Sequence, residues 1–148
     1  MPLSSGEVIH DRYRIVKLLG QGGFGAVYRA WDLNLQRPCA IKENLEVGIE
    51  SQEQFEREAR MLSNLSHPNL PRVTVYFTIQ DQWLYLVMVF VVGEDLQTKM
   101  DQSSVPLPEE RVLPWIRQIS AALDYLHNQT PPIIHRDIKP MNIIIRPD

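Results

Sequence analysis

An octapeptide near the carboxyl end of the chain carries the side chains that a group-transfer reaction needs. It reads His-Arg-Asp-Ile-Lys-Pro-Met-Asn and occupies residues 135–142. Asp137 can accept a proton from a hydroxyl group, and the neutral amide oxygen of Asn142 can bind Mg²⁺. Lys139 lies between them and can stabilise a phosphoryl group in transfer. These residue types at this spacing indicate phosphoryl transfer, whereas the side chain of His135 is expected to belong to the core.

A glycine-rich segment occurs much earlier, at residues 20–27, and fits the pattern G-x-G-x-x-G-x-V. Glycines let backbone amides approach phosphate oxygens closely, but the same pattern also fits a plain hairpin turn. The residues that follow, 26–31, include β-branched and aromatic side chains, so the segment reads as strand, turn and strand. A dinucleotide-binding turn must open a helix, and the chain contains no G-x-x-x-x-G-K-[ST]. Both of those nucleotide-binding folds are therefore excluded.

Lys42 and Glu58 form a second candidate pair. Lys42 ends a short apolar strand, where a lysine by itself is most simply a solvated residue. Glu58 lies beside the apolar stripe of a predicted helix, three residues after Phe55 and four before Leu62. A carboxylate in that position needs a partner, because burying an unpaired charge is costly. We therefore expect Glu58 to hold the Lys42 ammonium against a polyphosphate.

The first part of the chain reads as a small, mostly antiparallel sheet with one helix. Ser51 is the predicted helix cap, with Gln54 as its capping-box partner, and the helix ends at residues 67–69. The last two predicted strands form a hairpin around residues 80–82. The predicted strands cover residues 13–19, 26–31, 38–42, 73–79 and 83–91.

The second part, after a polar connection at residues 93–95, reads as helix and loop. A helix begins near Glu109, after two prolines, and its apolar residues recur at helical spacing. Residues 133–142 read as a polar loop, and residues 143–145 as a buried strand. The apolar stripe of the helix consists of Val112, Ile116, Ile119, Leu123 and Leu126.

The composition of the chain indicates which kinds of binding partner and which cellular compartment to expect. The chain has 148 residues, a net charge of −3 and no run of basic residues, which argues against nucleic acid or an anionic membrane as its partner. Its single cysteine, Cys39, cannot form an intrachain disulfide, so we expect a reducing, cytoplasmic location. The first eleven residues do not read as a signal peptide, and the most apolar stretch, 83–92, is too short for a membrane-spanning helix.

Four of these segments, in this order, resemble the signatures of the protein kinase family. They are the glycine-rich residues 20–27, the strand 39–42, Glu58 in the helix before residues 67–69, and residues 135–142. Residues 84–88 also resemble the strand leading into the kinase hinge, and Lys139 resembles the Ser/Thr branch of the family. The resemblance implies an α+β, protein-kinase-like fold: a five-stranded antiparallel N-lobe sheet with one helix, followed by the first helices and the catalytic loop of a helical C-lobe.

The resemblance also implies domain limits and residue roles. Residues 1–12 would be an N-terminal extension, 13–91 the N-lobe, and 92–148 the hinge exit and part of the C-lobe. Lys42 would contact the α and β phosphates of ATP and pair with Glu58. Asp137 would be the catalytic base, Lys139 would contact the γ phosphate, and Asn142 would hold Mg²⁺. The remaining nucleotide contacts would come from Leu19, Gly20, Gln21, Gly22, Gly23, Phe24, Gly25, Val27, Ala40, Met88, Val89, Val91 and Asp95.

The implied activity is transfer of phosphate from Mg-ATP to Ser or Thr hydroxyls of a protein substrate. Two alternatives remain open: a kinase remnant that binds nucleotide or a partner without catalysis, and a small-molecule phosphotransferase, which fits the glycine pattern less well. Cys39 stands where valine is usual, and Val89 where an acidic residue is frequent. The 148 residues contain no Asp-Phe-Gly segment, so we expect this front part of a kinase domain to be inactive alone. We also expect it to self-associate through the uncovered helix stripe.

Overall fold

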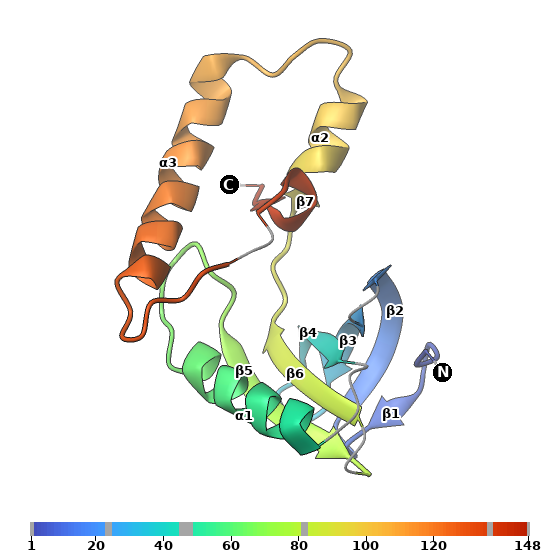
Figure 1. Ribbon diagram of the computed structural model, residues 1–148. Helices are drawn as coiled ribbons and strands as arrows, with labels where there is room; N and C mark the ends of the chain where they lie inside the picture. Colours follow the sequence, from blue (N-terminus) through green and yellow to red (C-terminus); the bar gives the residue numbers. More distant parts are fainter. Residues whose placement is uncertain (1, 23–24, 45–48, 81–82, 136–137, 148) are drawn as a thin grey trace. The chain divides into compact units, whose positions relative to one another are not determined.

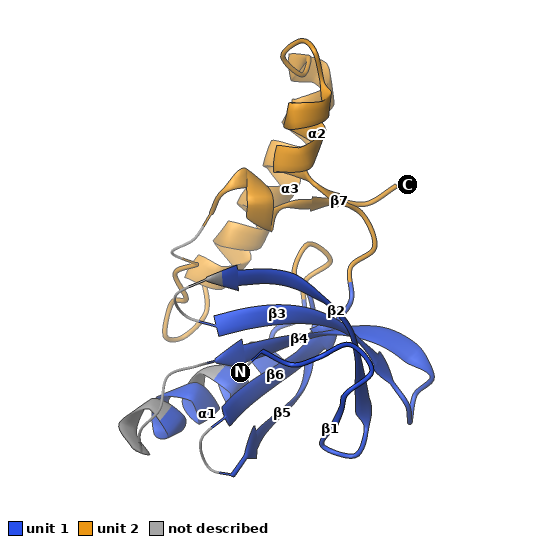
Figure 2. Ribbon diagram, turned by 90° about the vertical axis from the view of Figure 1, so that its right-hand side faces the viewer, with its two compact units in different colours: residues 1–66, 71–90 blue, residues 67–70, 91–148 orange. Residues whose placement is uncertain are grey.

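The computed structural model describes residues 2–22, 25–44, 49–80, 83–135 and 138–147. The chain divides into two compact units, coloured separately in Figure 2. Unit 1 contains residues 1–66 and 71–90, and unit 2 contains residues 67–70 and 91–148. No helix in the described parts of either unit has the length and apolar character needed to cross a bilayer.

Unit 1 is an antiparallel sheet with a helix, α1, along one side (Figure 1). Its strand order is β1-β2-β3-β4-β6-β5, which places β5 at one edge. The helix α1, Ile49–Ser63, begins two residues before the predicted cap Ser51. The strands are β1 Val8–Ile9, β2 Tyr13–Gly22, β3 Gly25–Asp32, β4 Arg37–Asn44, β5 Val73–Ile79 and β6 Trp83–Val89.

The five strands expected from the sequence are present, and β1 adds a sixth. Val8 and Ile9 pair with Arg14 and Tyr13 of β2, and Ile9 is buried in the core. The amide of Leu3 donates a hydrogen bond of 3.0 Å to the hydroxyl of Tyr28. Residues 2–12, expected to form an extension, are thus hydrogen-bonded to the sheet. Two neighbouring residues could not reveal this strand through alternation of apolar and polar side chains.

Each face of the sheet carries its own apolar cluster, as the period of two in a strand requires. One cluster includes Tyr13, Tyr28, Ile41 and Val87, all almost completely buried. The other joins Phe55 and Ala59 of α1 to strand residues on the opposite face, namely Val73, Leu84 and Leu86. The predicted apolar stripe of α1 therefore packs against β5 and β6.

Unit 2 contains two α-helices, a short 3₁₀ helix and a two-stranded ladder. Among its described residues, α3 buries only Ala122 and Leu126, and Ile116 of the predicted stripe is 49% exposed. The strand expected at residues 143–145 is present as Ile144–Ile145, but Ile144 is 40% exposed, so the expectation that it is buried was wrong. The helix α2 was not predicted. The elements are β7 Glu94–Asp95, α2 Leu96–Gln102, α3 Glu109–His127, η1 Pro140–Asn142 and β8 Ile144–Ile145.

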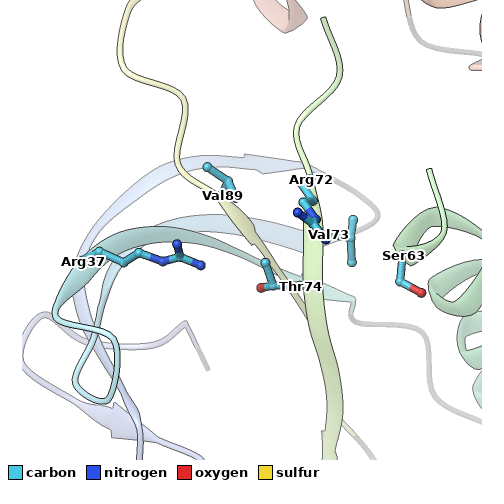
Figure 3. Close-up of a pocket in the computed structure, with 6 residues that line it drawn as sticks. All are labelled: Arg37, Ser63, Arg72, Val73, Thr74 and Val89. Atoms are coloured by element: carbon cyan, nitrogen blue, oxygen red, sulfur yellow. The ribbon is translucent and has the colours of Figure 1, made fainter. Parts of the chain in front are cut away.

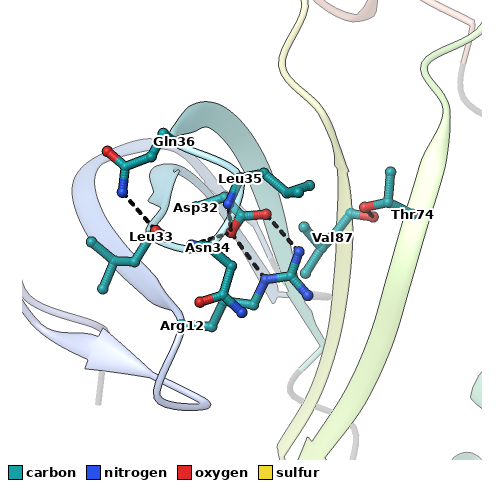
Figure 4. Close-up of polar contacts among 8 residues, drawn as sticks. All are labelled: Arg12, Asp32, Leu33, Asn34, Leu35, Gln36, Thr74 and Val87. Atoms are coloured by element: carbon teal, nitrogen blue, oxygen red, sulfur yellow. Dashed lines mark hydrogen bonds and ion pairs between the residues drawn. The ribbon is translucent and has the colours of Figure 1, made fainter.

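An ion pair between Arg12 and Asp32 lies at the end of the β2–β3 ladder in unit 1 (Figure 4). Nε and Nη2 of Arg12 donate to the two carboxylate oxygens of Asp32 at 3.0 and 2.8 Å. Asp32 also accepts hydrogen bonds from the amides of Asn34 and Leu35, at 3.0 and 3.1 Å, and so shapes the turn into β4. The bonds from Arg12 are the main reason that the pKa of Asp32 is lowered from its usual value. A bidentate pair with a buried carboxylate is stronger than a surface ion pair.

We predict that Asp32→Ala lowers the free energy of unfolding by about 3 kcal/mol, because it removes the acceptor of four hydrogen bonds and leaves Arg12 unpaired. Urea denaturation at neutral pH measures this, and Arg14→Ala, at an exposed position of β2, is the control. The folded pKa is lowered, so the pair's stabilisation is complete above the unfolded Asp pKa, about 4, and is lost as the pH falls through the folded value. An Asp32→Asn variant that keeps the full acid sensitivity of the wild type would contradict the assignment.

Candidate functional site

The glycine-rich residues form a hairpin between β2 and β3, as the sequence indicated. The register pairs Gly20 with Val27, Gln21 with Ala26 and Gly22 with Gly25. Gly23 and Phe24, at the predicted turn, lie outside the described residues. The register shifts between Leu18 and Gly20, so Leu19, which is 45% exposed, lies at an irregularity of the ladder. The segment is strand, turn and strand, and no helix begins at it.

At Gly25, the first residue of β3, the structure requires the lack of a side chain. Its φ is +140°, and a Cβ there would collide with the backbone oxygen of Glu43 on the neighbouring strand β4. Gly20 differs, because a Cβ at that position would meet nothing within 4 Å. The close approach of β3 to β4 therefore depends on Gly25.

Strand β4 presents Ala40 and Lys42 to the face that carries α1. Ala40 pairs with Met88 and Lys42 with Leu86, both of which belong to the cluster around α1. Ala40 is buried, whereas Lys42 is exposed. Lys42 also pairs with Val27 of β3, which brings the end of the glycine hairpin beside the lysine.

Glu58 belongs to α1, but its side chain is not among those described. The ion pair between Lys42 and Glu58 therefore remains a prediction. The helix itself is in the expected place, since α1 packs on β5 and β6 through Phe55, Ala59 and Leu62.

The next residue on β4, Glu43, was missed by sequence reasoning. It lies on the opposite face from Lys42, is 2% exposed, and accepts a 2.8 Å hydrogen bond from the hydroxyl of Tyr85 on β6. Burial, and then this hydrogen bond, raises the pKa of Tyr85 above its usual value, so the phenol remains a donor. The signal available was the alternation of Cys39, Ile41 and Glu43, whose odd-numbered positions share the core face. The pair ties β4 to β6 immediately beside Lys42.

The predicted hinge follows the end of β6. The amide of Val89 donates a 2.8 Å hydrogen bond to the carbonyl of Arg72, at the start of β5. The guanidinium of Arg29, from β3, lies 4.9 Å from the centre of the Phe90 ring, within the range of a cation–π contact. Met88 is partly buried against the cluster around α1. Contacts with Arg29 of β3, with Arg72 before β5 and with the cluster around α1 thus hold the backbone on either side of Val89 in place.

In unit 2, the segment after the predicted hinge pairs with the strand after the octapeptide. Glu94 pairs with Ile145 and Asp95 with Ile144. Gly93 permits this approach, because its φ is +154° and a Cβ there would collide with the backbone oxygen of Ile145. The two segments, about fifty residues apart in sequence, are therefore neighbours within unit 2.

Asp95, the predicted ribose contact, is the N-cap of α2. Its carboxylate accepts hydrogen bonds from the amide and the hydroxyl of Thr98, at 2.9 and 2.7 Å. These bonds lower the pKa of Asp95 from its usual value, so the carboxylate is ionised at neutral pH. Val91, the other predicted contact in this segment, is partly buried.

The catalytic octapeptide is described in part. Lys139 is extended, with φ −155° and ψ 159°, and Asn142 ends the short helix η1. The amide of Asn142 donates a 2.9 Å hydrogen bond to the carbonyl of Lys139, which fixes the backbone between the two residues. Asp137 and Arg136 lie outside the described residues. The part of the chain that is described holds no group of three or more His, Cys, Asp or Glu side chains placed to bind a metal.

The comparison with known families decides the classification. The protein kinase domain family matches residues 13–148. The chain belongs to the protein kinase family. The curated relatives YbdM of Bacillus subtilis and pkn3 of Myxococcus xanthus are named as Ser/Thr protein kinases, and the sheet with α1 is the antiparallel sheet and helix of the kinase N-lobe.

Individual relatives extend over nearly all of this kinase chain. The probable Ser/Thr protein kinase YbdM of Bacillus subtilis is 33% identical over 147 residues, which cover 97% of this chain and 56% of YbdM. The Ser/Thr protein kinase pkn2 of Myxococcus xanthus is 38% identical over 93% of this chain and 16% of its own length. The crystal structure of the Mycobacterium tuberculosis PknI kinase domain has a TM-score of 0.79 and 27% identity, and the match covers 99% of this chain and 59% of that one. The chain thus spans little more than half of YbdM or of the PknI structure.

We predict that Gly25→Ala destabilises this kinase chain by about 2–4 kcal/mol, because the methyl group would meet the Glu43 carbonyl and the backbone would be strained at positive φ. Gly20→Ala, in the same hairpin but with open space at Cβ, should change the stability by less than about 1 kcal/mol. Chemical denaturation of the two variants in parallel is the measurement. Equal effects of the two substitutions would show that the contact between β3 and β4 does not require Gly25.

Proposed function

We propose that this chain supplies the ATP-binding lobe and the catalytic loop of a protein Ser/Thr kinase, which transfers phosphate from Mg-ATP to protein hydroxyl groups. The observation that carries the proposal is the register of β2, β3 and β4. It pairs Gly20 with Val27, and Val27 with Lys42, so that the glycine hairpin lies directly beside the lysine. Backbone amides and an ammonium group are the donors that a polyphosphate requires.

In this proposal the adenine ring of ATP lies against the apolar side chains of Val27 and Ala40. Met88, partly buried beside α1, limits the depth of the pocket. The carbonyl of Val89 and the amide of Val91 bind the polar edge of the base, and the contacts around Val89 and Phe90 give that backbone a fixed path. The glycine hairpin, residues 19–25, covers the phosphates.

The family signatures supply the residues proposed for the transfer step. Lys42, held by Glu58, positions the phosphates, and Asp137 accepts the proton of the attacking hydroxyl. Lys139 stabilises the transferred group. The amide oxygen of Asn142 is chemically suited to Mg²⁺, which when bound neutralises negative charge on the phosphate oxygens. One neutral ligand holds Mg²⁺ weakly, so a polypeptide of these 148 residues should bind nucleotide without transferring phosphate.

The same weak metal site supports a second candidate function, a nucleotide-binding module without catalysis. The discriminating observation is whether transfer appears when the chain is joined to the remaining part of a kinase domain.

A cytoplasmic location agrees with the single thiol, Cys39, whose burial raises its pKa to about 11 and keeps it protonated and unreactive.

We predict that the purified 148-residue chain shows a small ATP-dependent thermal shift that Lys42→Met weakens, because the ammonium that binds the phosphates is lost. Transfer of radiolabelled phosphate to a generic Ser/Thr substrate should not exceed that of an Asp137→Asn control. In a longer polypeptide that completes the kinase domain, Lys42→Met and Asp137→Asn should each abolish transfer. Near-normal turnover of either variant would contradict the assigned roles.

We further propose that the 148-residue chain self-associates through α3, where Leu113 is 37% and Ile116 is 49% exposed. Ile116→Glu should reduce the association, because it places a charge in an apolar contact. Light scattering at about 50 μM, where weak dimers form, is the measurement. Arg117→Gln, the neighbouring exposed position, serves as control. A wild-type chain that is monomeric under these conditions would contradict the proposal.

A further inference from the structure

A hollow of about 440 Å³ opens in unit 1 where strands β4 and β5 begin and β6 ends (Figure 3). Its volume falls within the usual range of ligand pockets. The strand β5 is the last in the sheet, so no further strand blocks access to the hollow from that side. Its lining consists of Arg37, Ser63, Arg72, Val73, Thr74 and Val89.

The strand register brings the two arginines to this place. Val89 of β6 pairs with Cys39 of β4 on one side, and its amide donates to the carbonyl of Arg72 on the other. Arg37 is two residues before Cys39 and therefore shares its face of the sheet, the face opposite to that of Lys42. In Figure 3 the Arg37 side chain points from β4 toward Thr74, and Arg72 lies above Thr74, immediately before β5.

The charge of this hollow is positive and uncompensated. Both arginines are exposed, and within the described ranges neither makes an ion pair. None of the six lining residues is acidic. The hydroxyl groups of Ser63 and Thr74 donate to the backbone carbonyls of Arg60 and Val87, at 2.8 and 3.2 Å. The guanidinium groups are therefore the side-chain donors that remain for a ligand.

The chemistry of the lining selects the class of ligand. Guanidinium groups bind phosphate through paired hydrogen bonds, and two of them balance the charge of a phosphomonoester, close to −2 at neutral pH. Val89, which is 39% exposed, adds apolar surface, which a free phosphate ion cannot use and the carbon atoms next to a phosphate ester can. We propose that this hollow binds a phosphorylated Ser or Thr side chain of a peptide segment. The site shares Val89 with the residues assigned to ATP, but its two arginines are not among them, and Arg37 lies on the face of the sheet opposite to Lys42 and Ala40.

The test is a binding titration of the 148-residue chain with a fluorescent peptide, Gly-Ala-Ala-phosphoThr-Ala-Ala-Gly, followed by anisotropy. We expect saturable binding that the unphosphorylated peptide does not show. The double variant Arg37→Gln and Arg72→Gln should weaken binding at least tenfold, and each single variant several-fold. Arg14→Gln, an exposed arginine on β2, and Lys42→Met, at the proposed ATP site, should leave the affinity unchanged. Thermal melting of each variant verifies that it is folded.

Three outcomes would overturn the proposal. Inorganic phosphate competing as tightly as the phosphopeptide would indicate an adventitious ion only. Equal binding of the same peptide with Glu in place of phosphothreonine would indicate a general acidic-peptide site. No saturation by about 1 mM peptide, or loss of binding on Lys42→Met but not on the double arginine variant, would show that the hollow has no such role. Failure of the ATP-binding test would leave these outcomes unaffected, since the titration needs neither nucleotide nor catalysis.

Discussion

The register of β4 between β3 and β6 is the constraint on which the proposed site depends. Successive side chains of a strand point to opposite faces, so a shift of one residue would exchange Lys42 and Glu43. Lys42 would then enter the core face among Cys39 and Ile41, and Glu43 would replace it beside the glycine hairpin. The native register is fixed on one side by the contact of Gly25 with the Glu43 backbone, and on the other by the hydrogen bond from Tyr85.

The buried Glu43 carboxylate lowers the stability of the fold but favours a single register of β4 against β6. Burying a carboxylate with few partners is unfavourable, and an apolar residue of similar size would fit the cluster at lower cost. A hydrogen bond to Tyr85, however, can form only when β4 and β6 are correctly paired, because Glu43 lies opposite Tyr85 in the ladder. A shift by two residues would leave the carboxylate buried opposite another residue, and a shift by one would place the Lys42 ammonium in the core instead, so both are disfavoured relative to the native register. The residue next to the proposed phosphate-binding lysine thus specifies the lysine's position.

Sequence reasoning succeeded where a pattern repeats over several residues. The long strands, the apolar stripe of α1 and the helix α3 all rest on several regularly spaced side chains, and the structure has each of them. The elements that it missed, β1 with two residues and α2 with seven, are too short to show a period. The pairs Arg12–Asp32 and Tyr85–Glu43 were missed for another reason. Their partners are 20 and 42 residues apart, and a single sequence contains no signal for such contacts.

The residues of the proposed site also fall into two groups, those that the sequence predicted and those that only the structure revealed. The family signatures named Lys42, Asp137 and Asn142 because they occur in short contiguous motifs. The residues that fix the backbone around them, such as Gly93 and Arg29, became evident only from contacts between strands distant in sequence. Exposure of α3 was not predictable from its apolar stripe alone, because the period of a helix gives the direction of its apolar face but not what covers it.

Asp95 shows that a structural role and an assigned contact can be compatible in one side chain. Its two carboxylate oxygens each accept one hydrogen bond from Thr98, and both bonds serve to begin α2. A carboxylate oxygen can accept more than one hydrogen bond, so the bonds from Thr98 do not by themselves prevent a bond from a ribose hydroxyl. The cap also improves Asp95 as an acceptor, because the lowered pKa keeps the group ionised and the bonds to Thr98 fix its rotamer. The proposed contact with a sugar hydroxyl is therefore compatible with the conformation in which Asp95 caps α2.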